Sequence, residues 1–140
     1  MIQAIAIGEQ SLAGVQQIGE EIMKCIAARD FEALGKHFHP RVACRLLVPP
    51  GLFTPLDASA LVSKYQQWFG EADAFNIESS QITQVGDWLH VGYRIRLRES
   101  GRWHLIEQQT FSCVEDGLIT RFDLLCSGFH SGFQPEVSTT

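Results

Sequence analysis

The sequence lacks several features that would define a specialised class of protein. It has no run of about 18 apolar residues, so we expect no membrane-spanning helix and no membrane partner. The first stretch, MIQAIAIGEQ, has no basic segment before an apolar core, which is the pattern of a signal peptide. We therefore expect a cytoplasmic protein.

Excess positive charge is also missing. Lys and Arg total 11 against 16 Asp and Glu, which gives a formal net charge of −5. Binding to phosphate backbones needs clustered basic residues, so we expect no nucleic-acid partner.

Closely spaced metal ligands are absent as well. The four cysteines, Cys25, Cys44, Cys113 and Cys126, contain no CxxC pair. We expect free thiols in a reducing compartment and no structural metal. No phosphate loop or dinucleotide fingerprint occurs, so we expect no tightly bound cofactor.

What is present is the composition of an ordinary globular domain. The chain of 140 residues is 45% hydrophobic and 19% charged. This length suits a single domain over residues 1–140. We expect its ends, residues 1–10 and 130–140, to be flexible or loosely packed.

The N-terminal half has the periodicity of three helices. Apolar residues three or four apart predict an amphipathic helix from Ser11 to about Ile26. A shorter helix is expected from Asp30, and it must end before Pro40. The segment Thr54-Pro55-Leu56-Asp57 predicts the start of a third helix with Thr54 as its cap, which ends near Gly70.

The remainder is expected to form strands. VACRLLV, residues 42–48, is apolar and β-branched, and three later turns separate four further strands. These turns are Gly86-Asp87, Ser100-Gly101 and Asp116-Gly117. Helices followed by an antiparallel meander predict an α+β domain.

Alternation along each strand predicts which side chains face the helices. In the strand over residues 88–98, the inner row is expected to be Leu89, Val91, Tyr93, Ile95 and Leu97. In the last strand it is Phe122, Leu124 and Cys126. In the strand between them, the row with the more apolar ends is Trp103, Leu105, Glu107, Gln109, Phe111 and Cys113. This choice makes Glu107 the one acid expected in the interior.

The segments ARDFEALGKHFHPRV, GDWLHVGYRIRL and FSCVEDGLITRFDLL, in this order, resemble the NTF2-like superfamily and its SnoaL-like branch. The resemblance covers about residues 11–128. It implies a cone in which a curved, mostly antiparallel sheet wraps around three N-terminal helices and encloses a pocket. It also implies a frequent homodimer through the outer face of the sheet.

The resemblance does not extend to the ketosteroid isomerase site. The position of that family's general-base aspartate falls on Val48, and the tyrosine of its oxyanion hole falls near Ile22. The protonated aspartate of the oxyanion hole falls on Gln109, and only a supporting tyrosine is retained, at Tyr65. Without a base at Val48, proton abstraction has no agent.

The first functional hypothesis is an apolar small-molecule pocket with acid–base capacity, as in an isomerase, lyase or cyclase. Glu107 is the candidate general acid or base, and Gln109, Tyr65 and Tyr93 are candidate hydrogen-bond donors. The expected pocket wall is Trp68, Phe111, Phe122, Leu124, Cys126, Cys44, Val48 and Ile22. The structural alternative is that Glu107 pairs with an arginine or with backbone.

Two other hypotheses remain open. One is that the chain is a non-catalytic module for ligand binding or dimerisation. Its outer row would then be a solvated or dimeric face, made of Arg94, Arg96, Arg98, His104 and Arg121. Alternatively, Cys44 and Cys126 approach one another and carry thiol chemistry. Their apolar neighbours favour inert packing.

Overall fold

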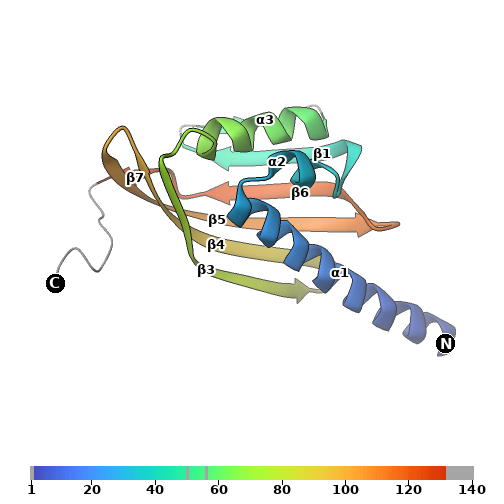
Figure 1. Cartoon of the computed structure of the whole chain (residues 1–140). Coiled ribbons are helices and arrows are strands. Elements are labelled where there is room, and N and C mark those ends of the chain that lie inside the picture. The colour runs from blue at the N-terminus through green and yellow to red at the C-terminus, as the bar shows by residue number, and fades with distance from the viewer. Residues whose placement is uncertain (1, 50, 56, 132–140) are drawn as a thin grey trace.

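A computed structural model describes the backbone of residues 2–49, 51–55 and 57–131, with side chains from residue 14 onward in these ranges. The helices are α1 (Ile2–Ala28), α2 (Phe31–Gly35) and α3 (Ala58–Phe69). The strands are β1 (Phe38–Val48), β2 (Gly51–Phe53), β3 (Ala74–Val85), β4 (Trp88–Glu99), β5 (Arg102–Glu115), β6 (Leu118–Cys126) and β7 (His130–Ser131). The helices lie together on one face of the sheet (Figure 1).

The strands form one open sheet in the order β2-β1-β6-β5-β4-β3, with the short β7 paired to β5. β1 and β6 are parallel, and the other neighbours are antiparallel. The sheet curves around the helices and does not close. The predicted α+β cone, with a mostly antiparallel sheet around N-terminal helices, is therefore confirmed.

The predicted helices are present, but two of their starts differ. α1 begins at Ile2 rather than Ser11, because residues 2–10 contain no proline and only one glycine to interrupt it. α3 is capped by Asp57 rather than Thr54, since Oδ1 of Asp57 accepts a hydrogen bond from the Ala60 N–H at 2.8 Å. Asp30 caps α2 as predicted, accepting from the Ala33 N–H at 3.1 Å.

The expected loose ends receive only a partial description. Residues 2–10 continue the backbone of α1, and His130–Ser131 form β7. Residues 1 and 132–140 lie outside the described residues. Within the described part of the chain, no helix is long and apolar enough to cross a membrane.

The three predicted hairpin turns connect consecutive strands. Ser100 and Gly101 have φ values of 55° and 76°, and Asp116 and Gly117 have 52° and 81°. Two left-handed residues in a row are typical of the tight turn that matches strand twist. These turns set the strand register on which the functional faces depend.

Arg29 joins the ends of α1 and α3. It has a φ of +54° and ends α1 in a Schellman motif, in which Arg29 N–H bonds Ile26 O and Asp30 N–H bonds Cys25 O. Its Nη1 also donates to the carbonyl oxygens of Phe69 (3.0 Å) and Ala72 (2.7 Å). The guanidinium therefore compensates for a backbone conformation that favours glycine.

We expect Arg29→Ala to destabilise the protein by roughly 2–3 kcal/mol, because it keeps the left-handed strain and loses two charge-assisted hydrogen bonds. Arg29→Gly should be more stable than Arg29→Ala by about 1 kcal/mol, since glycine adopts positive φ freely. Urea denaturation of both variants measures the difference. Equal stability of Arg29→Ala and wild type would show that the two carbonyl contacts contribute nothing.

Candidate functional site

The inner faces of β4 and β6 agree with the prediction. In β4, Leu89, Val91, Tyr93, Ile95 and Leu97 are all buried. In β6, Phe122, Leu124 and Cys126 are buried, whereas Ser127, which follows the strand, is exposed. These side chains face the helices and form the main core.

The inner face of β5 is the opposite of the predicted one. Its fully buried side chains are Ile106, Gln108, Thr110 and Ser112. Glu107 and Phe111 are exposed, and Gln109 is only partly buried. The placement of Glu107, Gln109 and Phe111 in the interior was therefore wrong.

Strand register is the physical reason. Across the Ser100-Gly101 turn, Tyr93 pairs with Gln108 and Val91 pairs with Thr110. Directly opposed residues lie on the same face of a sheet. Because Tyr93 is inside, Gln108 must be inside too, whatever the polarity of its neighbours along β5.

A β-bulge in β6 hides this register from a strand-by-strand interpretation. Val114 pairs with Ile119, but the next pair is Cys113 with Arg121, so Thr120 has no partner. Without this extra residue, Phe122 would lie opposite Phe111, as the predicted rows require. The bulge shifts the register by one residue and exchanges the two faces of β5 relative to β6.

Glu107 lies on the outer face in an ion pair. Its Oε1 is 3.2 Å from Nη2 of Arg94, and the two side chains are 46% and 48% exposed. The structural alternative, pairing of Glu107 with an arginine, is the arrangement present. A carboxylate on this face cannot act on a ligand held between the helices and the sheet.

The inner face carries a directed chain of neutral hydrogen-bonding groups instead. Oη of Tyr93 donates to Oε1 of Gln108 (2.6 Å), and Nε2 of Gln108 donates to Sγ of Cys126 (3.4 Å). Oη of Tyr65 lies 2.8 Å from Oη of Tyr93 and donates to it, because the Tyr93 proton is already engaged. We call Tyr65, Tyr93, Gln108 and Cys126 the inner polar chain.

Burial keeps the two phenols protonated. Desolvation raises the pKa of Tyr65, and it raises the pKa of Tyr93 with a further contribution from the neighbouring Tyr65. Both hydroxyls are therefore neutral donors near neutral pH. The inner polar chain thus consists of neutral hydrogen-bonding groups, and these phenols do not supply a base.

Gln108 is the residue that the sequence interpretation missed. It is 0% exposed and occupies the inner position that had been assigned to Gln109. The signal that would have found it was the hairpin register, counted from Ser100-Gly101 to the inward-facing Tyr93. Gln109, which the resemblance had matched to an oxyanion-hole residue, therefore does not lie on the inner face.

Two more polar groups continue along the inner face of β5. Oγ1 of Thr110 donates to the Val91 carbonyl at 2.9 Å. Ser112 is 1% exposed, and its Oγ has no hydrogen-bond partner among the described residues. An unpaired buried hydroxyl is costly, so Ser112 is a second place where a ligand oxygen or a water would be stabilised.

The remaining predicted pocket residues lie in the core. Ile22, Cys44, Val48, Phe122 and Leu124 are each at most 8% exposed. Trp68 is partly buried, and its ring meets the Tyr65 ring edge-on at 5.4 Å. Tyr65 also packs on Phe31 and Phe69, which are 3% and 0% exposed. Trp68 is therefore the least buried of the three aromatic side chains.

The two inner cysteines do not form a pair. Cys44 lies opposite Phe122 in the parallel β1–β6 ladder, and Cys126 is four residues farther along β6. At about 3.3 Å per residue, this separates the two backbone positions by roughly 13 Å. The suggested approach of Cys44 to Cys126 was wrong.

Cys44 has the properties of a packing residue. It is 5% exposed, and desolvation raises its pKa to about 12, with smaller contributions from Asp123 and Asp57. A reactive thiol requires a lowered pKa and solvent access. Within the described residues, no group of three or more His, Cys, Asp or Glu side chains is arranged to hold a metal.

The outer arginine row is largely neutralised. Arg94 pairs with Glu107, Arg96 with Glu78, and Arg98 with Asp73. Arg121 lies over the Trp88 ring at 6.0 Å, whereas His104 is partly buried on the inner row. The placement of His104 in the outer row was therefore wrong, and this face does not present a continuous positive charge.

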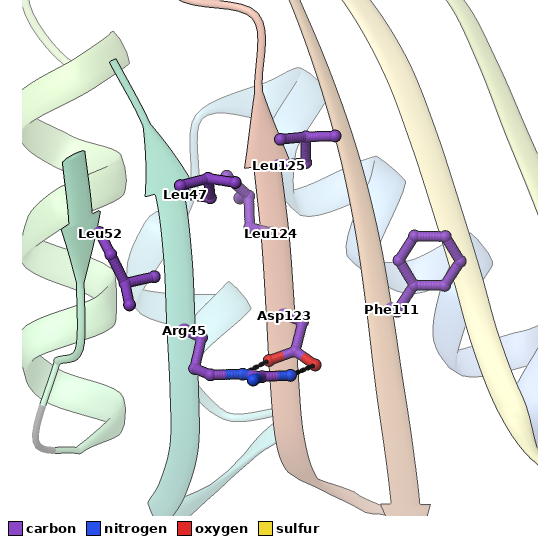
Figure 2. Close-up of a pocket in the computed structure, with 7 residues that line it drawn as sticks. All are labelled: Arg45, Leu47, Leu52, Phe111, Asp123, Leu124 and Leu125. Atoms are coloured by element: carbon purple, nitrogen blue, oxygen red, sulfur yellow. Dashed lines mark hydrogen bonds and ion pairs between the residues drawn. The ribbon is translucent and has the colours of Figure 1, made fainter. Parts of the chain in front are cut away.

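The part of the outer face over β1, β2, β5 and β6 is apolar. Leu47, Leu52, Phe111 and Leu125 are 51%, 59%, 38% and 52% exposed. They line a recess of about 290 Å³ together with Leu124 and the ion pair between Arg45 and Asp123 (Figure 2). Both oxygens of Asp123 accept hydrogen bonds from the Arg45 guanidinium at 2.9 Å. We call Leu47, Leu52, Phe111 and Leu125 the outer apolar cluster.

Comparisons with known proteins identify the fold. No protein-family model matches the chain, and no curated protein matches it. A candidate ketosteroid isomerase from Kribbella flavida superposes with a TM-score of 0.63 at 14% identity, covering 88% of this chain and 82% of that one. A candidate polyketide cyclase from Xanthomonas campestris gives 0.61 at 16% identity, covering 79% and 91%.

An NTF2-like protein of unknown function from Cytophaga hutchinsonii gives a TM-score of 0.58 at 14% identity, covering 81% of this chain and 89% of that one. These similarities establish that the chain has the NTF2-like fold, as the SnoaL-like resemblance predicted. At these identities they extend to the fold alone, because one fold hosts many unrelated functions.

Burial of Cys44 predicts a pH-dependent stability. The thiol of the unfolded chain loses its proton near pH 9, whereas the folded chain keeps it to about pH 12. Ionisation therefore favours the unfolded state, and stability should fall as the pH rises above 9. Urea denaturation at about pH 8 and about pH 10 should show a smaller fall for Cys44→Ala than for wild type. Identical falls would contradict the assigned burial of the thiol.

Proposed function

We propose that the protein binds a small molecule that has an apolar body and a hydroxyl or carbonyl oxygen, between α3 and the inner face of the sheet. The observation that carries this proposal is the inner polar chain. Its groups are neutral, fully directed and surrounded by apolar side chains, which is the composition of a small-molecule site. The apolar part of the ligand would contact Trp68 and Leu124.

The direction of the chain specifies how a ligand oxygen would bind. Tyr65 gives its proton to Tyr93, so the lone pairs of the Tyr65 oxygen are available to a ligand hydroxyl. A ligand carbonyl would instead compete for the Tyr65 proton, while Tyr93 keeps its bond to Gln108. We expect entry beside Trp68, because it is the least buried aromatic contact of Tyr65.

The names of structural neighbours support a small-molecule role. One neighbour is named as a candidate ketosteroid isomerase and another as a candidate polyketide cyclase. A third structure is a designed protein from work on diverse pocket structures, with a TM-score of 0.56 at 17% identity. For this chain, Glu107 is not proposed as the acid or base of such a reaction, since it faces away from the inner polar chain.

A matched pair of probes tests the proposal. We expect 2-naphthol to bind about fivefold more tightly than naphthalene, because only the naphthol can hydrogen bond to Tyr65. Tyr65→Phe should abolish this preference while leaving naphthalene binding unchanged. Titration calorimetry or naphthol fluorescence measures both affinities.

Glu107→Gln is the control for this experiment, because it changes an outer side chain and should leave both affinities as in wild type. Equal binding of the two probes by wild type would contradict the proposed role of the inner polar chain. Preference for naphthol retained by Tyr65→Phe would do the same.

The outer apolar cluster favours a second role, homodimerisation through the outer face of the sheet. Exposed apolar side chains that line one recess are typical of protein–protein contact sites. A two-fold axis through this face would bury the cluster against its copy. Arg45 and Asp123 would provide complementary charges beside the axis.

We expect the wild-type protein to sediment as a dimer at micromolar concentration and Leu125→Lys to sediment as a monomer. The lysine would place a charge in the apolar contact, which is unfavourable without a partner. Val85→Lys is the matched control, since Val85 is 55% exposed but lies outside the outer apolar cluster. A monomeric wild-type protein, or a dimeric Leu125→Lys variant, would refute this interface.

We also infer a reducing, cytoplasmic setting. The support is that Cys25, Cys44, Cys113 and Cys126 are all free thiols in a protein whose core uses two of them as buried hydrophobes.

A further inference from the structure

A second recess, of about 300 Å³, lies on the outer face over β3, β4 and β5. Its lining residues are Ser79, Ser80, Gln81, Gly92, Tyr93, Arg94, Glu107 and Gln109, of which Tyr93 and its opposed neighbour Ser80 direct their side chains to the inner face. It shares no lining residue with the apolar recess of Figure 2. It also lies on the opposite face of the sheet from the inner polar chain, so its occupancy is independent of the proposed function.

Gly92 forms the floor of this recess. A Cβ at Gly92 would overlap Oε1 of Gln109, so the amide of Gln109 can lie across the sheet only because this position is glycine. The glycine therefore has a local packing role, in the middle of a strand where glycine otherwise weakens pairing.

A chain of hydrogen bonds orients the polar groups of the recess. Nε2 of Gln109 donates to Oε2 of Glu107 (3.2 Å), whose Oε1 bonds Nη2 of Arg94 (3.2 Å). Oε1 of Gln109 faces Nε2 of His90 at 2.6 Å, so that nitrogen must carry a proton. Nδ1 of His90 in turn lies 2.8 Å from Oγ1 of Thr83. Outer-shell bonds of this kind hold binding groups in one geometry.

A bulge in β3 places the hydroxyl of Ser79 beside the same recess. Glu78 is the extra residue between the pairs Ile77–Ile95 and Ser79–Arg94. Bulges redirect side chains and are frequent beside binding sites. Beyond the bulge, Ser79 pairs with Arg94 and Ser80 pairs with Tyr93, so the Ser79 side chain, and not that of Ser80, shares the outer face with Arg94.

The charge and hydrogen-bonding capacity of the recess indicate its ligand. Arg94 and Glu107 offset one another, so the site offers no net charge to attract an anion or a cation. It offers donors from the guanidinium and amides, acceptors from the carboxylate, and a serine hydroxyl that acts as both. Neighbouring hydroxyl groups on a neutral ligand satisfy such a mixed set, because each can donate to Glu107 and accept from Arg94.

We propose that this recess binds a neutral, polyhydroxylated small molecule the size of a monosaccharide or cyclitol. The volume of about 300 Å³ is at the small end of ligand pockets, which suits one sugar ring. The hydroxyl of Ser79 contacts one edge of the ring, and Glu107 and Arg94 contact the other.

Chemical-shift titration of ¹⁵N-labelled protein tests this site. The probes are D-glucose, D-galactose and myo-inositol, with sodium acetate and methylammonium chloride as charged probes. At least one polyol should shift the Gly92 amide and the Gln109 side-chain amide saturably. Glu107→Gln should weaken the binding of that polyol roughly tenfold, because the substitution removes charge-assisted hydrogen bonds.

Asp73→Asn is the matched control. It breaks the Arg98–Asp73 ion pair (3.3 Å), which is exposed like Arg94–Glu107 but lines neither recess. Its polyol affinity should equal that of wild type. Ser79→Ala should also lose affinity, and this change is at an exposed position that leaves the core intact.

Three results would overturn the proposal. The first is the absence of a saturable shift with every polyol. The second is a shift of the same resonances by acetate or methylammonium instead of a polyol. The third is wild-type polyol affinity in both Glu107→Gln and Ser79→Ala. Loss of naphthol selectivity in Tyr65→Phe has no bearing on any of them, since that tyrosine faces the helices.

Discussion

The register of β5 is the constraint on which both faces of the sheet depend. β5 is a central strand, hydrogen bonded to β4, β6 and β7. The tight Ser100-Gly101 turn aligns it with β4, and the bulge at Thr120 aligns it with β6. Side chains alternate with a period of two, so a slip of one residue would exchange every side chain between the helices and solvent. Gln108 is buried and Glu107 is exposed for this reason alone.

The two faces differ in the kind of polar group that they hold. The described interior holds phenols, an amide, hydroxyls and thiols, whereas the ion pairs of Arg45, Arg94, Arg96 and Arg98 all lie on the outer surface. Desolvation explains the division, because a buried ion pair rarely regains the hydration that it loses. Neutral donors remain useful in an apolar interior, where each hydrogen bond is stronger than in water. The proposed ligands follow this division, with a single oxygen function on the inner face and apolar contact or a hydroxyl-rich ligand on the outer face.

Much of the architecture could be predicted because its signals are local. Asp30 caps its helix through its own side chain, and Asp116-Gly117 turns through its own backbone preference, so both were found from neighbouring residues. The prediction of Thr54 as a cap was wrong because Asp57, three residues later, offers an equally good acceptor closer to the helix. The alternation within β4 and β6 identified their inner rows correctly, since those strands are strongly amphipathic.

By itself, the sequence determined the class of fold, the order of helices and strands, the turns, and the burial of Tyr65, Tyr93 and Cys126. The tertiary structure decided which of the two rows of β5 side chains faces the helices. It therefore decided which polar residues lie together on each face. β5 is polar on both rows, so its composition contains no preference for either face. Only the pairing with β4 on one side and the bulged pairing with β6 on the other assigns Gln108 to the interior and Glu107 to solvent, because opposed residues must share a face.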